Sequence, residues 1–115
     1  MPPELLPANH LPDHFKQYLT AQQLAMVEFK AEWSGGSHLL SPIVKKLAST
    51  YQNELLYISL DADQHQALTR WYGIEQFPTL LLLQHGQVAD QITGIHSEAA
   101  IAQRINQLIT PKNNH

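Results

Sequence analysis

Two serines three positions apart are the side chains of this chain whose type and spacing could do chemistry. They are Ser34 and Ser37, within the stretch AEWSGGSH at residues 31–38. A nucleophilic serine needs a base within hydrogen-bonding reach and a third group that orients this base. His38 follows Ser37 directly, but adjacent residues of a helix do not face each other, and the chain has no Gly-x-Ser-x-Gly elbow. The pattern therefore does not favour a serine hydrolase.

The same two serines lie where a helix is expected to begin. Gly35 and Gly36 interrupt the preceding apolar stretch, and apolar residues follow at helical spacing. Ser34 or Ser37 is expected to accept a hydrogen bond from the free N–H groups of the first turn, a cap that contributes about 1 kcal/mol. The helix start could also hold an anion, although no arginine lies nearby in the sequence to support one.

Thiol chemistry and metal binding are both disfavoured by the residue types present. The 115 residues contain no cysteine, whereas thiol–disulfide exchange needs one thiolate to attack and a second thiol to resolve the mixed disulfide. The seven histidines are scattered, and the closest pair, His10 and His14, has Pro12 between its members and no evident third ligand. We expect no cofactor and no metal.

The composition predicts one small domain. A chain of 115 residues with 43% hydrophobic content can bury a single core, so we assign one domain to residues 1–115, with a core from about 11 to 109 and a polar tail at 110–115. The net charge of −3 with seven Lys and Arg provides no basic face for nucleic acid. The N-terminus lacks a secretion signal, and the longest wholly apolar run is residues 80–83. We therefore expect a soluble, cytoplasmic protein with no membrane partner.

Hydrophobic periodicity predicts alternating helices and strands in the first half of the chain. A helix is expected at residues 11–19 and a buried strand at 24–29. A long helix follows, and then a strand at 55–60. The long helix is expected to carry one apolar face, made of Leu39, Leu40, Ile43, Val44, Leu47 and Tyr51. The strand–helix–strand unit should be parallel and right-handed.

The second half predicts a short helix, a hairpin and a closing helix. Asp63 and Gln66 resemble a capping box for the short helix, which should turn Ala67, Leu68 and Trp71 inward and end at Gly73. Strands at 79–83 and 88–92 are joined around His85-Gly86. The final helix, from about Ser97, should carry one apolar stripe, made of Ile101, Ile105, Leu108 and Ile109. The predicted class is α/β, with a central mixed β-sheet flanked by helices on both faces.

The motifs, taken in order, resemble the thioredoxin family from about Leu24 to Leu108. Residues 27–33 (VEFKAEW) match the strand that enters the family's active site, Pro42 matches its helix proline, and Phe77-Pro78-Thr79 follows Tyr72-Gly73-Ile74 as in the family. Gly86 and Gly94 match the hairpin glycine and the glycine beside the site. The resemblance implies a thioredoxin fold with a cis-proline loop at Pro78, in which serine occupies both cysteine positions.

The resemblance also implies where a partner would bind. The family's substrate face corresponds here to Trp33, Ser34, Gly35, Gly36, Ser37, Phe77, Pro78, Gly94 and Ile95. In thioredoxins the residue before the cis proline pairs through its main chain with an extended substrate segment, so Phe77 is expected to offer a short edge for β-augmentation.

Three further positions depart from the family pattern. Glu28 stands where the family usually has a buried aspartate, Ser59 stands where a lysine often pairs with it, and Lys30 replaces a common tryptophan. We expect Glu28 to extend toward solvent or to bond to Lys30 or a backbone group.

Three kinds of function stay open at this point. The first is a domain without thiol–disulfide oxidoreductase activity, not an enzyme, that binds a polypeptide non-covalently as an adaptor or chaperone-like module. The second is a thioredoxin protein-disulfide reductase whose two catalytic cysteines have been replaced by serine. The third is a structural subunit that uses an apolar helix face in an oligomer. The client and the oligomeric state are left open.

Overall fold

The computed structural model describes residues 24–109. The elements, in chain order, are β1 (Leu24–Lys30), α2 (Gly35–Thr50), β2 (Leu55–Asp61), the 3₁₀ helix η2 (Ala62–Gln64), α3 (Gln66–Trp71), β3 (Thr79–Gln84), β4 (Gln87–Thr93) and α4 (Glu98–Ile109). The helix predicted at 11–19, the tail at 110–115, His10 and His14 lie outside the described residues.

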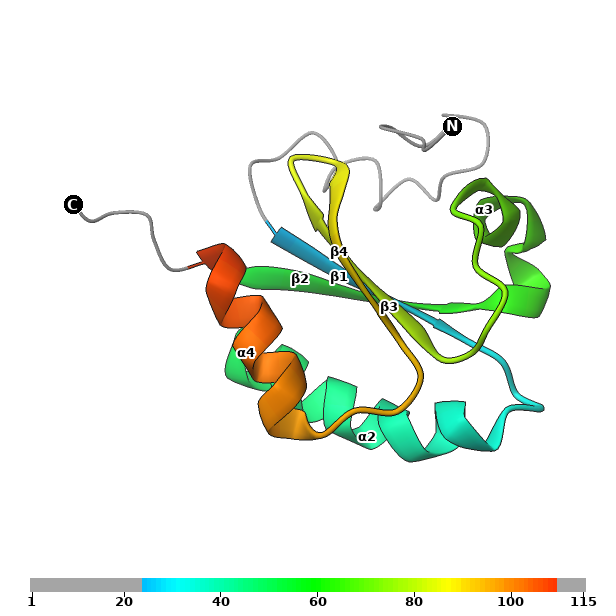
Figure 1. The fold of residues 1–115 in the computed structure, drawn as a ribbon, viewed down its shortest axis with the longest axis horizontal. Helices are drawn as coiled ribbons and strands as arrows, with labels where there is room; N and C mark the ends of the chain where they lie inside the picture. Colours follow the sequence, from blue (N-terminus) through cyan, green and yellow to red (C-terminus); the bar gives the residue numbers. More distant parts are fainter. Residues whose placement is uncertain (1–23, 110–115) are drawn as a thin grey trace.

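The four strands form one mixed sheet with the order β2-β1-β3-β4 (Figure 1). β1 and β2 are parallel, whereas β3 is antiparallel to both β1 and β4. The hairpin between β3 and β4 turns at His85 and Gly86, whose φ angles of 57° and 82° lie in the left-handed region. The predicted parallel unit, hairpin and central mixed sheet are confirmed.

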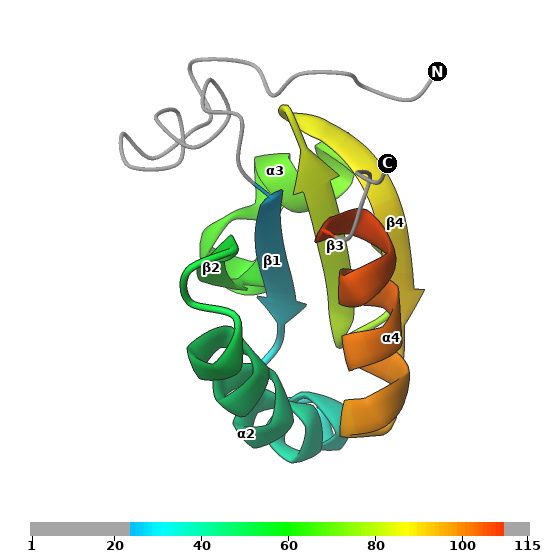
Figure 2. The ribbon, with the colours of Figure 1, turned by 90° about the vertical axis from the view of Figure 1, so that its left-hand side faces the viewer.

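Helices cover both faces of the sheet, since α2 and α4 lie on one side and α3 on the other (Figure 2). Successive side chains of a strand point to opposite faces, so β1 contributes to two cores. Leu24 and Met26 pack with residues of α2 and α4, whereas Val27 and Phe29 pack on the side of α3. Both faces of β1 are therefore buried.

Two apolar residues expected inside are in fact exposed. Leu39 is 66% exposed, because the buried stripe of α2 runs through Leu40, Val44 and Leu47, and Leu39 lies about 100° around the helix from Leu40. Trp71 is 40% exposed at the end of α3, a six-residue helix too short to bury more than the side that carries Leu68.

The expected capping box at Asp63 is also wrong. β2 extends to Asp61, and the Asp61 carboxylate accepts the cap hydrogen bond, from Asp63 N, at the start of η2. Gln66 instead begins α3 and donates its side-chain amide to Asp63 O. Gly73, at φ 68°, follows this helix as predicted.

Neither a membrane span nor a metal cluster is found in the part of the chain that the structure describes. None of its helices is long and apolar enough to cross a bilayer. No three His, Asp or Glu side chains between residues 24 and 109 come together as possible metal ligands.

Candidate functional site

Both loop serines are buried and use their hydroxyls to hold the start of α2. Ser34 is the N-cap: its Oγ accepts a hydrogen bond from Ser37 N (3.2 Å) and donates one to Phe77 O (3.1 Å). Ser37 Oγ accepts from Ala31 N at 3.1 Å. The capping prediction is confirmed for Ser34, whereas Ser37 supports the loop before the helix. Ser34 thus ties the helix start directly to the proline loop.

His38 is not positioned as a base for either serine. Its Nε2 lies 2.7 Å from Glu32 O, and because a carbonyl oxygen can only accept, this nitrogen carries the proton and donates it. The arrangement lacks the serine–base contact that a nucleophilic serine needs.

The helix start packs directly on the proline loop. The Phe77–Pro78 peptide bond is cis. A Cβ added to Gly36 would lie 3.1 Å from Pro78 Cδ and 3.5 Å from Ile95 Cδ1, which is closer to the proline than ordinary van der Waals contact. Gly94, at φ 88°, donates its N–H to Pro78 O at 2.8 Å. Three separate chain segments are therefore held together at this point.

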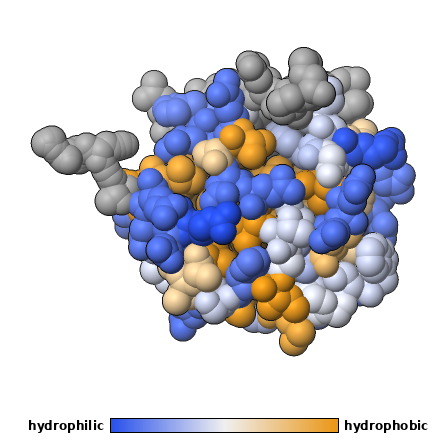
Figure 3. Space-filling view, viewed as in Figure 1, coloured by the Kyte–Doolittle hydropathy of each residue, from blue (hydrophilic) through white to orange (hydrophobic). Residues whose placement is uncertain are grey.

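Near this junction lies a group of apolar side chains that are exposed or half-buried, here called the apolar face: Trp33, Phe77 and Ile95, with Leu39 about one helical turn after Gly36 on α2. The rings of Trp33 and half-buried Phe77 meet edge to face, with centroids 5.6 Å apart. Trp33 is 69% exposed and Ile95 is 53% exposed. Figure 3 shows hydrophobic surface over α2 and the segment between β4 and α4.

The structure brings all nine sequence-predicted site residues to this junction. Leu39 is the one member of the apolar face that sequence reasoning missed, because its helical spacing placed it with the core. Helical periodicity alone could have separated Leu39 from Leu40, since neighbouring residues cannot both lie at the centre of a buried stripe.

Glu28 behaves differently from the prediction, because it neither reaches solvent nor bonds to Lys30. It is completely buried, and each carboxylate oxygen accepts a hydroxyl: Ser41 Oγ donates to Oε2 at 2.7 Å and Tyr57 Oη donates to Oε1. Burying a charged group without such partners would cost several kcal/mol. The hydrogen bonds from the two hydroxyls therefore offset part of the free-energy cost of burying this carboxylate.

Burial raises the pKa of Tyr57 well above its usual range, and the hydrogen bond to Glu28 raises this pKa further. The Glu28–Tyr57 contact had a signal in the sequence. A parallel pairing of the two predicted strands sets Glu28 opposite Ser59, and Tyr57 lies two residues before Ser59, on the same face. No comparable signal pointed to Ser41.

Comparison with known proteins supports the resemblance to the thioredoxin family. The thioredoxin family model matches residues 7–107. Thioredoxin 2 of Chlorobaculum tepidum is 30% identical over 93 residues, covering 81% of this chain and 85% of that protein. The thioredoxin of Pyropia yezoensis is 28% identical over 97 residues, covering 84% of this chain and 91% of that protein. With its sheet topology, its proline loop and these matches, the chain belongs to the thioredoxin family, as a thioredoxin-like domain that contains no cysteine.

Proposed function

We propose that this domain binds extended or partly unfolded polypeptides non-covalently through the apolar face, as an adaptor or chaperone-like module. The observation that carries the proposal is that Trp33, Leu39 and Ile95, each more than half exposed, belong to segments that meet where the start of α2 packs on the proline loop. Exposed apolar side chains that gather in one place are typical of protein interaction sites, and aromatic residues are enriched at the centres of such sites.

The hydrogen bonds of the two serines support binding rather than catalysis. Both hydroxyls are engaged within the chain, and no thiol is available for exchange. A bound polypeptide would therefore be released without a chemical step, at a rate set by its contacts alone.

The main-chain groups of Phe77 suggest how a client would lie. Its carbonyl already accepts a hydrogen bond from Ser34, whereas its N–H has no acceptor among the described residues. A client strand would receive one main-chain hydrogen bond from Phe77 N–H, and most of its binding energy would come from apolar side chains on Trp33, Leu39 and Ile95. The sequence predicts β-augmentation at Phe77. In this proposal the pairing is reduced to one main-chain hydrogen bond, donated by Phe77 N–H.

The test is a fluorescence titration of the full chain with a permanently unfolded polypeptide, reduced and carboxymethylated α-lactalbumin. In a Trp71→Phe background Trp33 is the only tryptophan, so its emission reports on the apolar face. We expect a saturable blue shift, and a loss of affinity of about tenfold or more in Phe77→Asp and Ile95→Asp, because each places a charge at the centre of the contact.

Val88→Asp is the matched control, since Val88 is an exposed apolar residue on β4 that is not part of the apolar face. Absence of saturation in the wild-type chain, or equal weakening by Val88→Asp and Ile95→Asp, would refute the proposal.

The alternative of a silenced reductase makes a separate prediction. If serine only interrupts an otherwise complete enzyme, Ser34→Cys with Ser37→Cys should reduce insulin disulfides at a rate approaching that of a thioredoxin. We expect the folded double variant to be far slower, because Glu28 is tied to Ser41 and Tyr57 and Ser59 stands opposite it where the family often has lysine.

A further inference from the structure

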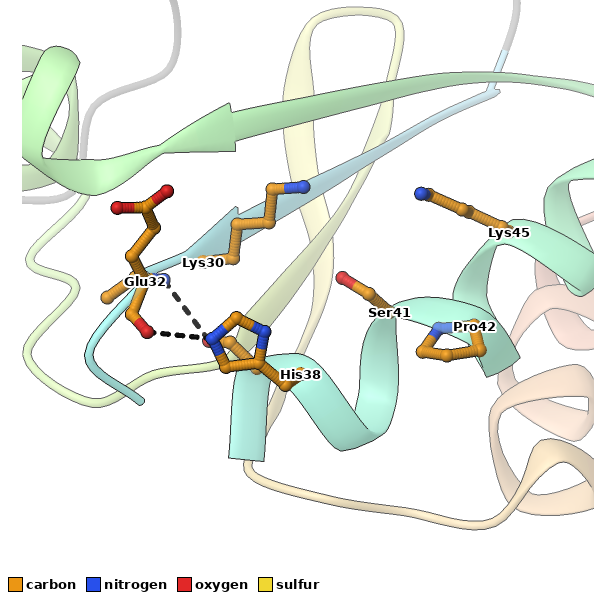
Figure 4. Close-up of a pocket in the computed structure, with 8 residues that line it drawn as sticks. Lys30, Glu32, His38, Ser41, Pro42 and Lys45 are labelled. Carbon is orange, nitrogen blue, oxygen red and sulfur yellow. Dashed lines mark hydrogen bonds between the residues drawn. The ribbon is translucent and has the colours of Figure 1, made fainter. Parts of the chain in front are cut away.

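A hollow on the surface between the end of β1 and α2 is lined by two lysines and includes none of the four side chains of the apolar face, although Glu32 and His38 in its lining adjoin that face in sequence. Its volume is about 320 Å³, at the lower end of the range for small-molecule sites. Lys30, His38, Ser41 and Lys45 contribute to its walls. Figure 4 shows the amino groups of Lys30 and Lys45 pointing toward one another across the hollow, with the Ser41 hydroxyl between and below them.

The two amino groups are not used elsewhere in the described part of the chain. Within residues 24–109, Lys46 pairs with Glu98 and Arg104 pairs with Asp90, whereas Lys30 and Lys45 have no ion-pair partner. The nearest acidic side chain of the lining, Glu32, directs its carboxylate away from the space between the lysines (Figure 4). In a chain of net charge −3, two unpaired cations that face one hollow favour an anionic ligand.

Ser41 restricts which anion fits. Its hydrogen is donated to the buried carboxylate of Glu28, so its oxygen offers only lone pairs to the hollow. A ligand between the lysines can therefore bond to Ser41 only if it carries an O–H donor as well as negative oxygens for the amino groups. Monohydrogen phosphate has both, whereas sulfate at neutral pH has negative oxygens but no O–H.

We propose that this hollow is a binding site for an oxyanion that carries a hydroxyl group, with inorganic monohydrogen phosphate as the matching ligand. Lys30 and Lys45 would hold the negative oxygens, and Ser41, fixed by Glu28, would accept the P–OH hydrogen. The buried Glu28 carboxylate beneath Ser41 disfavours an anion that cannot offer a donor in that direction. This inference does not depend on the proposed polypeptide binding.

The experiment is an NMR titration of the ¹⁵N-labelled full chain at pH 7 and constant ionic strength, with sodium phosphate in one series and sodium sulfate in the other. We expect saturable amide shifts at residues 30–32, 41 and 43–45 with phosphate, and binding of sulfate that is about tenfold weaker, because one hydrogen bond to a charged ligand is lost. Methyl phosphate, whose dianion also lacks the O–H, should behave as sulfate does and so distinguishes free phosphate from phosphomonoesters.

Lys30→Gln with Lys45→Gln should lose at least tenfold in phosphate affinity, while the matched control Lys46→Gln, a neighbouring exposed lysine, should keep it. Thermal unfolding checks the fold of the double variant, and if that variant unfolds, Lys45→Glu repeats the test with one exposed side chain.

Three outcomes would overturn the proposal. One is a linear, non-saturating response to phosphate in the wild-type chain, as expected if the lysines serve only to offset the charge of Glu28. Another is equal affinity for phosphate and sulfate. The third is a loss of phosphate affinity in the control Lys46→Gln that equals the loss in the Lys30→Gln, Lys45→Gln double variant.

Discussion

Replacing Tyr57 with phenylalanine removes one of the two hydroxyls that support the buried carboxylate of Glu28. A hydrogen bond to a charged group is worth about 1.5–3 kcal/mol, and a buried acceptor left without a partner costs a similar amount. Glu28 is completely buried and keeps only the bond from Ser41. We therefore expect Tyr57→Phe to lower the free energy of unfolding by about 2 kcal/mol, or the melting temperature by about 8 °C for a chain of 115 residues.

Urea unfolding followed by far-UV circular dichroism measures this loss. Tyr51→Phe is the matched control, because the Tyr51 hydroxyl also donates to a side chain, Asn106 Oδ1, but at an exposed position. An exposed pair of this kind contributes less, so the control should lose about 0.5 kcal/mol. The comparison separates burial of the acceptor from simple removal of a tyrosine hydroxyl.

A double-mutant cycle then isolates the contact itself. In a Glu28→Met background the carboxylate is absent, so Tyr57→Phe should cost little, and the coupling energy should be about 1.5–3 kcal/mol. If Tyr57→Phe costs the same in both backgrounds, or no more than Tyr51→Phe, the contact does not stabilise the fold and the reasoning is wrong.

Three further changes test the junction and the sheet edge. Ser34→Ala should lower the free energy of unfolding by about 1 kcal/mol in urea melts, because the helix cap is lost; an unchanged value would contradict the capping role. Gly36→Ala should be less stable than Gly35→Ala by about 1 kcal/mol in the same assay. The reason is that a Cβ at Gly36 would lie 3.1 Å from the cis proline, whereas one at Gly35 meets nothing within 4 Å. Equal losses of stability in the two variants would argue against the close approach of Gly36 to Pro78. The hydrogen bonds from Arg104 hold the pKa of the Asp90 carboxyl below its usual range. The stability that this pair adds is therefore fully present above the pKa of an aspartate in the unfolded chain, about 3.9. It is lost as the pH falls through the lower pKa that Asp90 has in the folded chain. Asp90→Asn should therefore cost less than about 1 kcal/mol at pH 7 and still less at pH 2, and a loss that grows toward acid would contradict this sign.

The two serines hold the loop before α2 in place through hydrogen bonds of their hydroxyls. Ser34 caps α2 and reaches Phe77 O, while Ser37 holds Ala31 N. These hydrogen bonds hold the helix start against the proline loop, so the segments that carry the apolar face are held together without a disulfide. Function in this domain is therefore expected to depend on surface shape and exposure.

Much of the fold was determined by the sequence alone, because local patterns carry it. Periodicity and turn residues predicted the four described strands, α2 and α4 to within a few residues, and the order of motifs indicated the family. The absence of cysteine excluded thiol exchange without any structure. The sequence also predicted a serine cap at the start of α2, on Ser34 or Ser37, and the structure assigns it to Ser34.

The tertiary structure decided what depends on contacts between distant segments. Glu28 became a fully buried carboxylate because α2 brings Ser41, and β2 brings Tyr57, to its two oxygens. Leu39 was left on the surface because α4 and the sheet cover only one stripe of α2. Lys30 and Lys45 face one hollow because the end of β1 lies beside α2. Packing between elements decides these groupings, whereas periodicity along one element indicates at most a face, as it does for Leu39 on α2 and for Tyr57 on β2.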